Sequence, residues 1–231
     1  MSEARYAIYA APRRDEALWR FGSGLLGYDA AKPGDVAAPD LAGITRADWH
    51  SLTTEPRLYG FHATLKAPFR LAGGQSESAL HNALSDFCRR HQALPAFSLH
   101  VARLGPFFAL VPKNANPGLQ ALAGDVVEAF DPFRAALSLE EMARRNPAQL
   151  PARERGYLER WGYPYVFDAF RFHMTLTGRV GEEKREQVEA VLRDAYAALP
   201  PDPFFLAELV LFRQDTQGSR FVIVSRHAFT G

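Results

Sequence analysis

The chain has 231 residues, of which 47% are apolar and 23% are charged, and this composition excludes global disorder. The 27 basic and 26 acidic side chains nearly balance, which argues against a broad surface for nucleic acid or anionic membranes. A single cysteine, Cys88, excludes an intrachain disulfide and a four-cysteine zinc site. No stretch approaches the roughly 18 apolar residues of a membrane span, and the first residues lack a signal peptide, so we expect a cytoplasmic protein.

The first part of the chain is expected to alternate strands and helices. A strand over residues 5–10 precedes a helix over 15–26 that ends at Gly27. Residues 28–57 carry several prolines and glycines, which indicates mostly loop with a short turn near 46–52. The following elements are a strand over 59–66 that stops before Pro68, a helix over 76–91, and strands over 97–104 and 107–112.

The middle of the chain, about residues 113–169, differs in character because prolines interrupt its helical pieces. These pieces are expected over 119–130, 139–145 and 151–161. We interpret the segment as an inserted connection that forms one wall of a cleft. Its arginine-rich stretch, 144–160, is interpreted as a solvated helical face rather than a lid over a substrate.

The last part of the chain is expected to repeat the order of the first part. A strand over 170–178 precedes a helix over 182–199 and a hairpin of strands over 204–213 and 220–227. The order strand, helix, hairpin therefore occurs at about 59–112 and again at about 170–227, which indicates an internal duplication. We predict a single α+β domain over 1–231 with two pseudo-symmetric lobes, each an antiparallel sheet with flanking helices, around a central cleft. Lobe one would span about 1–112, the connection 113–169, and lobe two 170–231.

Each copy opens with the same five-residue word, Phe-His-x-Thr-Leu, at residues 61–65 and 172–176. Random arrangement of this composition would give the word about 0.002 times in a chain of this length. Alternate side chains of a strand share a face, so each word has an apolar face and a polar face with a nearby cation. The polar faces carry His62, Thr64 and Lys66 in the first copy and Arg171, His173 and Thr175 in the second.

Two such faces that meet across a cleft suit chemistry at phosphorus. Hydroxyls and cations bind phosphoryl oxygens, and one imidazole can accept a proton from the incoming oxygen while the other donates one to the leaving oxygen. Histidine fits both tasks because its pKa lies near neutrality. This reaction needs no metal and no cofactor, and the sequence has no His-x-His or His-Glu-x-x-His motif. A glycine-rich stretch, 22–27, only superficially fits a phosphate-binding fingerprint because it follows a helix.

The two words and the phrases around them, 57–66 and 161–178, resemble the signature of the two-histidine (2H) phosphoesterase superfamily. The phrases are most similar to one branch, the uncharacterised proteins often encoded beside phosphonate-utilisation genes, and the likeness covers essentially the whole chain. The resemblance implies a LigT-like fold of two pseudo-symmetric lobes and a site made by the paired words, His62, Thr64, His173 and Thr175. It implies a reaction type and not a substrate.

We therefore expect a metal-independent phosphoric diester hydrolase that cleaves or opens a cyclic phosphate on a nucleotide, an RNA end or a ribose phosphate. Which histidine is the base, and the direction of the reaction, stay open. Lys66 and Arg171 are candidate phosphate contacts or solvated charges. Tyr9 and Tyr59 either line the cleft and stack on a base or sugar, or pack in the core.

Two other functions stay open at this point. The cleft could bind a phosphorylated metabolite or RNA end without turnover and regulate a partner. The protein could also have a structural role in a phosphonate-pathway assembly. In the enzymatic reading the partners are a small phosphorylated substrate or a nucleotide or RNA end, and the protein is a monomer without membrane contact.

Overall fold

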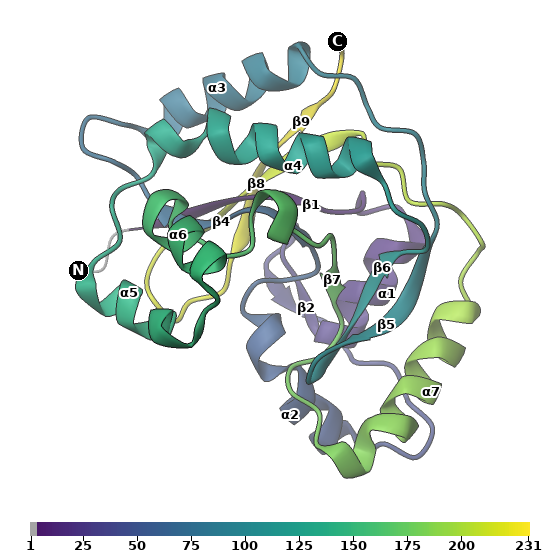
Figure 1. Cartoon of the computed structure of the whole chain (residues 1–231). Helices are drawn as coiled ribbons and strands as arrows, with labels where there is room; N and C mark the ends of the chain where they lie inside the picture. Colours follow the sequence, from purple (N-terminus) through teal and green to yellow (C-terminus); the bar gives the residue numbers. More distant parts are fainter. Residues whose placement is uncertain (1–3) are drawn as a thin grey trace.

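A computed structural model describes residues 4–231, and its central element is a seven-stranded sheet in which neighbouring strands run antiparallel (Figure 1). The strand order is β5-β6-β7-β4-β1-β8-β9, and β2 and β3 form a separate ribbon. The α+β class predicted from the sequence is confirmed. The strands are β1 (Arg5–Ala10), β2 (Tyr28–Asp29), β3 (Gly34–Asp35), β4 (Ala63–Arg70), β5 (Leu99–Leu104), β6 (Phe107–Pro112), β7 (Met174–Thr175), β8 (Glu208–Gln214) and β9 (Val222–Ala228).

Three helices pack on this sheet along its width. Figure 1 shows α3 and α4 side by side, with α3 on β8 and β9 and α4 on the central strand β4, while α7 lies beside β5 at the other edge. In the described residues no helix is both long and apolar enough to cross a bilayer. The α-helices are α1 (Ala17–Leu26), α2 (Arg46–Arg57), α3 (Glu77–Arg89), α4 (Pro117–Ala129), α5 (Leu139–Arg144), α6 (Ala152–Trp161) and α7 (Arg185–Ala197). Short 3₁₀ turns cover Asp131–Phe133, Pro147–Gln149, Phe167–Ala169 and Glu182–Lys184.

Residues 28–45 hold no helix, as expected, but the short turn expected near 46–52 is the start of a full helix, α2, that runs to Arg57. The Thr45 side chain caps this helix by accepting a hydrogen bond from the backbone N–H of Asp48. Trp49 fixes the helix against α1, since its indole N–H donates to the carbonyl of Leu25 at 2.7 Å. The prolines and glycines that indicated a loop lie mostly before Thr45, outside the helical stretch.

The strands that carry the two words also differ from their predicted bounds. β4 runs past Pro68 because this proline lies where the register between β1 and β4 shifts, and a missing N–H is tolerated there. β7 is only two residues long, against the nine expected over 170–178. Beyond Thr175 the chain bonds to Phe108 instead, through the backbone N–H of Leu176.

The two copies exchange their hairpins, which corrects the predicted division into lobes. The order strand, helix, hairpin is confirmed as β4-α3-β5-β6 and β7-α7-β8-β9. However, the hairpin β5–β6 pairs with β7 of the other copy, and β8–β9 pairs with β1 beside β4. The helices follow the same exchange, since α3 packs on β8 and β9 and α7 packs on β5. Residues 1–112 and 170–231 are therefore not separate lobes, because each half of the sheet takes strands from both.

Phe61, the first residue of the first word, is fully buried against α1. Its ring occupies the space that a β-carbon on Gly22 would need. Gly24, two residues further along α1 and therefore on the opposite side of the helix, has open space around it. Gly22 therefore serves packing and Gly27 ends α1 in the left-handed conformation, so these glycines have structural roles and do not form a phosphate-binding loop.

Replacing Gly22 with alanine should destabilise the protein even though alanine favours helices by about 1 kcal/mol. The added methyl overlaps the buried Phe61 ring, and such overpacking typically costs about 1–3 kcal/mol. Gly24→Ala is the matched control and should raise stability by up to about 1 kcal/mol. Urea denaturation measures both variants, and a Gly22→Ala protein at least as stable as Gly24→Ala would contradict the packing.

Candidate active site

The two words lie beside each other as neighbouring strands. Ala63 of β4 pairs with Met174 of β7 in antiparallel register. Continuing this register by one residue on each side sets each histidine opposite the threonine of the other word, with β-carbons about 4.5–5.5 Å apart. The resulting pairs are His62 with Thr175 and Thr64 with His173.

The apolar residues of both words face the opposite side of the sheet. They belong to one buried cluster with residues of α3, α4 and α7. The predicted alternation therefore holds through both words, and all four polar side chains point away from this core. The buried residues are Phe61, Ala63, Leu65, Phe172, Met174 and Leu176.

The imidazole of His62 is held in one tautomer. Its Nδ1 lies 2.9 Å from the carbonyl oxygen of Gly60, and a carbonyl only accepts, so Nδ1 carries the hydrogen. The Nε2 of the neutral ring is then a free acceptor, and the Thr64 hydroxyl, 3.2 Å away, can donate to it. Tyr9 stacks on the ring, with centroids 3.7 Å apart and planes inclined by 20°. The phenol ring thereby shields one face of the imidazole from water.

His173 repeats this arrangement in the second word. Its Nδ1 lies 2.8 Å from the carbonyl oxygen of Arg171, which again stands two residues earlier and again fixes the Nδ1–H tautomer. The Phe107 ring lies 5.8 Å away in a tilted contact. Within residues 4–231, the Nε2 of His173 has no hydrogen-bond partner, in contrast to that of His62. Both rings therefore present Nε2 to the cleft face.

Burial lowers the pKa of both histidines. Desolvation brings the pKa of His62 down to about 4, with a smaller lowering from the charge of His173 and an opposing contribution from the Gly60 carbonyl. Desolvation also lowers the pKa of His173, against a smaller rise from the Arg171 carbonyl. A positive charge on His173 disfavours protonation of His62, so the protonation state of one ring affects that of the other.

A hollow of about 720 Å³ opens beside these groups, between α2 and the start of β6. His62 and Thr175 both line it, together with Tyr59. Two further lining residues, Phe107 and Arg179, were not identified from the sequence. The only sequence feature that could have pointed to Arg179 is its position, three residues after the second word. An exposed arginine in a loop is common in any protein, so its residue type alone did not indicate a site.

The predicted tyrosines occupy two different positions. Tyr9 is only 1% exposed and its ring stacks on that of His62. It therefore packs in the core and holds the imidazole in place, and it does not offer a surface to a substrate. Tyr59 is partly exposed and lines the hollow, with its ring stacked on Phe221 at 5.3 Å. Arg171 is exposed and lines a separate hollow with Lys113 and Asn116, so only its backbone reaches the site.

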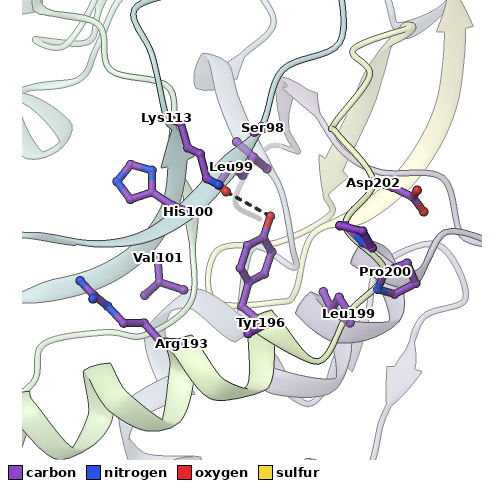
Figure 2. A pocket seen from close by; sticks show the side chains of 12 residues that line it. Ser98, Leu99, His100, Val101, Lys113, Arg193, Tyr196, Leu199, Pro200 and Asp202 are labelled. Carbon is purple, nitrogen blue, oxygen red and sulfur yellow. Dashed lines mark hydrogen bonds between the residues drawn. The ribbon is translucent and has the colours of Figure 1, made fainter.

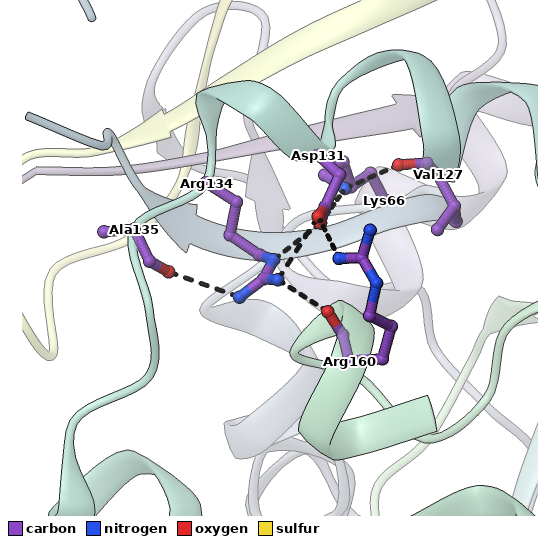
Figure 3. A network of polar contacts seen from close by, with 6 residues as sticks. All are labelled: Lys66, Val127, Asp131, Arg134, Ala135 and Arg160. Atoms are coloured by element: carbon purple, nitrogen blue, oxygen red, sulfur yellow. Dashed lines mark hydrogen bonds and ion pairs between the residues drawn. The ribbon is translucent and has the colours of Figure 1, made fainter. Parts of the chain in front are cut away.

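The prediction that Lys66 shares the face of His62 is wrong. Thr64 pairs with Tyr9, but Lys66 pairs with Ile8, so a β-bulge at Leu65 turns Lys66 to the core side. Figure 3 shows its ammonium group at the end of α4, where Nζ donates to the Val127 carbonyl at 2.9 Å.

Lys66 there belongs to a network around one carboxylate. Its Nζ lies 3.5 Å from Oδ1 of Asp131, which also pairs with Arg134 at 2.8 Å and with Arg160 of α6 at 3.1 Å. Burial lowers the pKa of Lys66 to about 8, although the neighbouring Asp131 opposes this shift. Lys66 therefore ties the helical connection to β4 and does not reach the cleft.

A second hollow, of about 420 Å³, lies between β5 and α7 (Figure 2). His100 and Lys113 line it, and the Tyr196 hydroxyl crosses it to the Leu99 carbonyl at 3.4 Å. Neither word contributes a residue, so this hollow is separate from the paired histidines. His100 therefore lies outside the site.

Two curated proteins are similar to this chain. A protein of Janthinobacterium sp. (strain Marseille) named ribose 1,5-bisphosphate phosphokinase PhnN is 37% identical over the whole chain and 52% of its own length. A protein of the same name from Laribacter hongkongensis (strain HLHK9) is 39% identical over 77% of the chain and 41% of its own length. The chain thus spans about half the length, or less, of these relatives.

Solved structures with a similar course of the chain include E. coli LigT complexed with NADP+, at a TM-score of 0.42 and 15% identity over 98% of both chains. A structure described as a phosphoesterase matches at a TM-score of 0.43 and 15% identity over the full length of both chains.

One family of proteins matches the greater part of the sequence. It is described as "Protein of unknown function (DUF1045)", and the match covers residues 64–222, from Thr64 of the first word through the whole of the second. This result agrees with the resemblance of the flanking phrases to a branch of uncharacterised proteins. The chain therefore belongs to the DUF1045 family.

Proposed function

We propose that this protein is a phosphoesterase that cleaves or opens a cyclic phosphodiester by acid–base catalysis between His62 and His173. One observation carries the proposal: two imidazoles, each locked with hydrogen on Nδ1, lie on one face of adjacent strands with a threonine opposite each. This arrangement supplies two proton-transfer groups and two hydroxyls on one face of the sheet, and His62 and Thr175 border the hollow beside it.

The reaction that suits this geometry is an in-line displacement by water. One histidine accepts a proton from water through Nε2 as the water oxygen bonds to phosphorus. The bond from phosphorus to the leaving oxygen breaks, and the other histidine, initially protonated, donates its Nε2 proton to that oxygen. The products are a phosphate monoester and a free hydroxyl. The pair of histidines keeps the same total charge, because one has gained a proton and the other has lost one, and exchange with solvent returns the proton to the histidine that acts as the acid.

We assign the base to His62 and the acid to His173. The deeper shift of the His62 pKa, to about 4, keeps its Nε2 unprotonated over most of the pH range. His173 has a less shielded ring and an Nε2 without a partner in the described chain, so it is free to meet a leaving oxygen. Thr64 and Thr175 would donate to the non-bridging oxygens as negative charge develops there, and Arg179 would add a positive charge from the hollow.

Ribose phosphates are the substrates to test first. The longer relatives are named as kinases that act on ribose 1,5-bisphosphate, and this chain corresponds to about half of each of them. Its own sequence contains no Gly-Lys-Ser or Gly-Lys-Thr of a phosphate-binding kinase loop. We therefore propose that this half contributes phosphodiester chemistry, consistent with the link to phosphonate metabolism suggested by resemblance, and not the kinase reaction.

Replacement of either histidine by alanine should lower kcat by about 10²–10⁴, the usual contribution of a general acid or base. The assay uses 2′,3′-cyclic AMP and ribose cyclic phosphates, with products identified by mass spectrometry. His50→Ala is the matched control, since His50 is exposed on α2, and it should keep full activity. Circular dichroism checks that each variant is folded.

The same assay in excess EDTA should show unchanged turnover, because the proposed steps use only protein groups. Activity that disappears in EDTA and returns with a divalent metal would contradict the two-histidine mechanism. Binding of substrate without any turnover by the wild type would favour the alternative of a non-catalytic binder.

The pH profile of kcat/KM should be bell-shaped with its maximum below pH 6.5. His62 has a pKa near 4, so it loses its function as a base only as the pH falls toward 4. The pKa of His173 is also lowered from 6.5, and His173 loses the proton it donates as the pH rises above that lowered pKa.

Tyr9→Leu should move the acid limb of this profile toward pH 6.5 by admitting water to His62, whereas Tyr9→Phe keeps the stacked ring and should leave that limb in place. A wild-type profile that still rises at pH 8 would refute the assignment.

A further inference from the structure

The hollow beside the paired histidines has a wall that the proposed reaction does not use. This wall is one face of α2, from which Ser51, Thr54 and Glu55 line the hollow of about 720 Å³. His62 and Thr175 line the same hollow. Residues three and four apart on a helix are neighbours on its surface, so the three side chains of α2 border one space. The part of a substrate that extends from the histidines into the hollow would meet this face of α2.

Helix α2 is joined directly to the segment that follows the second word. The backbone N–H of Gly178 donates to the carbonyl of Leu52 at 2.6 Å. A β-carbon on Gly178 would lie 3.1 Å from that carbonyl oxygen and 3.8 Å from Oε2 of Glu55, so the carboxylate of Glu55 reaches this segment. The indole of Trp49 ties the same helix to α1. The packing of α2 therefore fixes the backbone that carries Glu55 relative to Thr175.

The side chains on this face of α2 offer hydrogen-bond acceptors. Glu55 is the one carboxylate among the described residues that line the hollow, and within residues 4–231 it has no hydrogen bond or ion pair of its own. The Thr54 hydroxyl donates to the carbonyl of His50 at 2.9 Å, which leaves its oxygen free to accept. A carboxylate can only accept, and a serine hydroxyl can do so. This face of α2 is therefore suited to a ligand group that donates hydrogen bonds.

The segment of the second word offers donors to the same hollow. Arg179 lines it, can only donate, and has no ion pair within the described chain. The Thr175 hydroxyl lines it as well and can donate to a phosphate oxygen. A phosphate suits these donors, whereas a second phosphate beside Glu55 would be repelled by its charge. The hollow therefore fits a ligand that carries one phosphate and, next to it, groups that donate hydrogen bonds without negative charge.

We propose that Glu55, assisted by Ser51 and Thr54, accepts hydrogen bonds from free sugar hydroxyls of a substrate whose cyclic phosphate lies between the histidines. This inference rests on the proposed function and narrows its substrate class to small cyclic phosphates of sugars. A ribose 1,2-cyclic phosphate keeps free hydroxyls on its ring and at its end. The last ribose of an RNA chain with a 2′,3′-cyclic phosphate has none, because its 5′ oxygen is esterified. Glu55 is thus a specificity-determining residue and takes no part in the proton transfers.

Matched substrates with and without single hydroxyls test this contact in the wild type. The substrates are ribose 1,2-cyclic phosphate and its 3-deoxy and 5-deoxy analogues. Loss of a hydroxyl that donates to Glu55 should lower kcat/KM by about tenfold or more, mainly through KM, because hydrogen bonds to charged groups are the strong ones. The analogue with the larger loss identifies the hydroxyl that Glu55 contacts. Equal kcat/KM values for all three substrates would overturn the proposal.

The variants then show whether Glu55 causes this discrimination. Glu55→Ala should lower kcat/KM for the full substrate by the same factor as the missing hydroxyl, with no further loss on the deoxy analogue, since both changes remove one interaction. Glu55→Gln keeps an amide oxygen as acceptor and should retain part of the discrimination. Glu159→Ala, at an exposed position of α6, is the matched control and should leave all values unchanged. A Glu55→Ala variant that still discriminates like the wild type would refute the assignment.

A binding measurement keeps the test independent of turnover. Calorimetry with ribose 1,2-cyclic phosphate uses the His62→Gln/His173→Gln double variant, which lacks the proposed base and acid. Adding Glu55→Ala to it should weaken binding about tenfold or more, and adding Glu159→Ala should not. If the wild type turns over no cyclic phosphate, the proposed function fails, and this comparison alone decides whether Glu55 binds the sugar. Equal affinity of the two triple variants, or no binding by the double variant, would reject that contact.

Discussion

The pairing of Ala63 with Met174 is the contact on which the site depends. This residue pair sets the register between β4 and β7, and β7 is only two residues long. Because side chains alternate along a strand, a slip of β7 by one residue would turn His173 into the core while His62 stays on the other face. The large apolar residues of each word oppose such a slip, since Phe61 and Leu176 are fully buried on the other face. Hydrophobic burial on one side of the sheet thus fixes the chemistry on the other.

Local backbone and burial together decide what each histidine can do. The carbonyl two residues before each ring sets the same tautomer in both words, at 2.9 Å for His62 and 2.8 Å for His173. Their surroundings differ, because Tyr9 stacks on His62 while His173 has only a tilted contact with Phe107. A symmetric duplication therefore yields two groups of unequal acidity, which is what a base and an acid working in one reaction require.

The sequence predicted the features that follow from short-range pattern and missed those set by long-range pairing. Alternation placed His62 and His173 on polar faces, and repetition showed that the words belong together. The bulge at Leu65 could not be seen, because it depends on which residue of β1 faces Lys66. The exchange of hairpins between the copies escaped for the same reason, since strand order is not encoded in local periodicity.

The helical connection is tied to β4 through Lys66, which donates to the Val127 carbonyl and pairs with Asp131. The central claim, that both imidazoles face one anion, is tested most directly by a crystal structure with vanadate. The account predicts vanadate oxygens about 3 Å from Nε2 of both His62 and His173, with the Thr64 and Thr175 hydroxyls on the remaining oxygens. Vanadate bound to one ring alone, or bound elsewhere while both rings stay free, would contradict it.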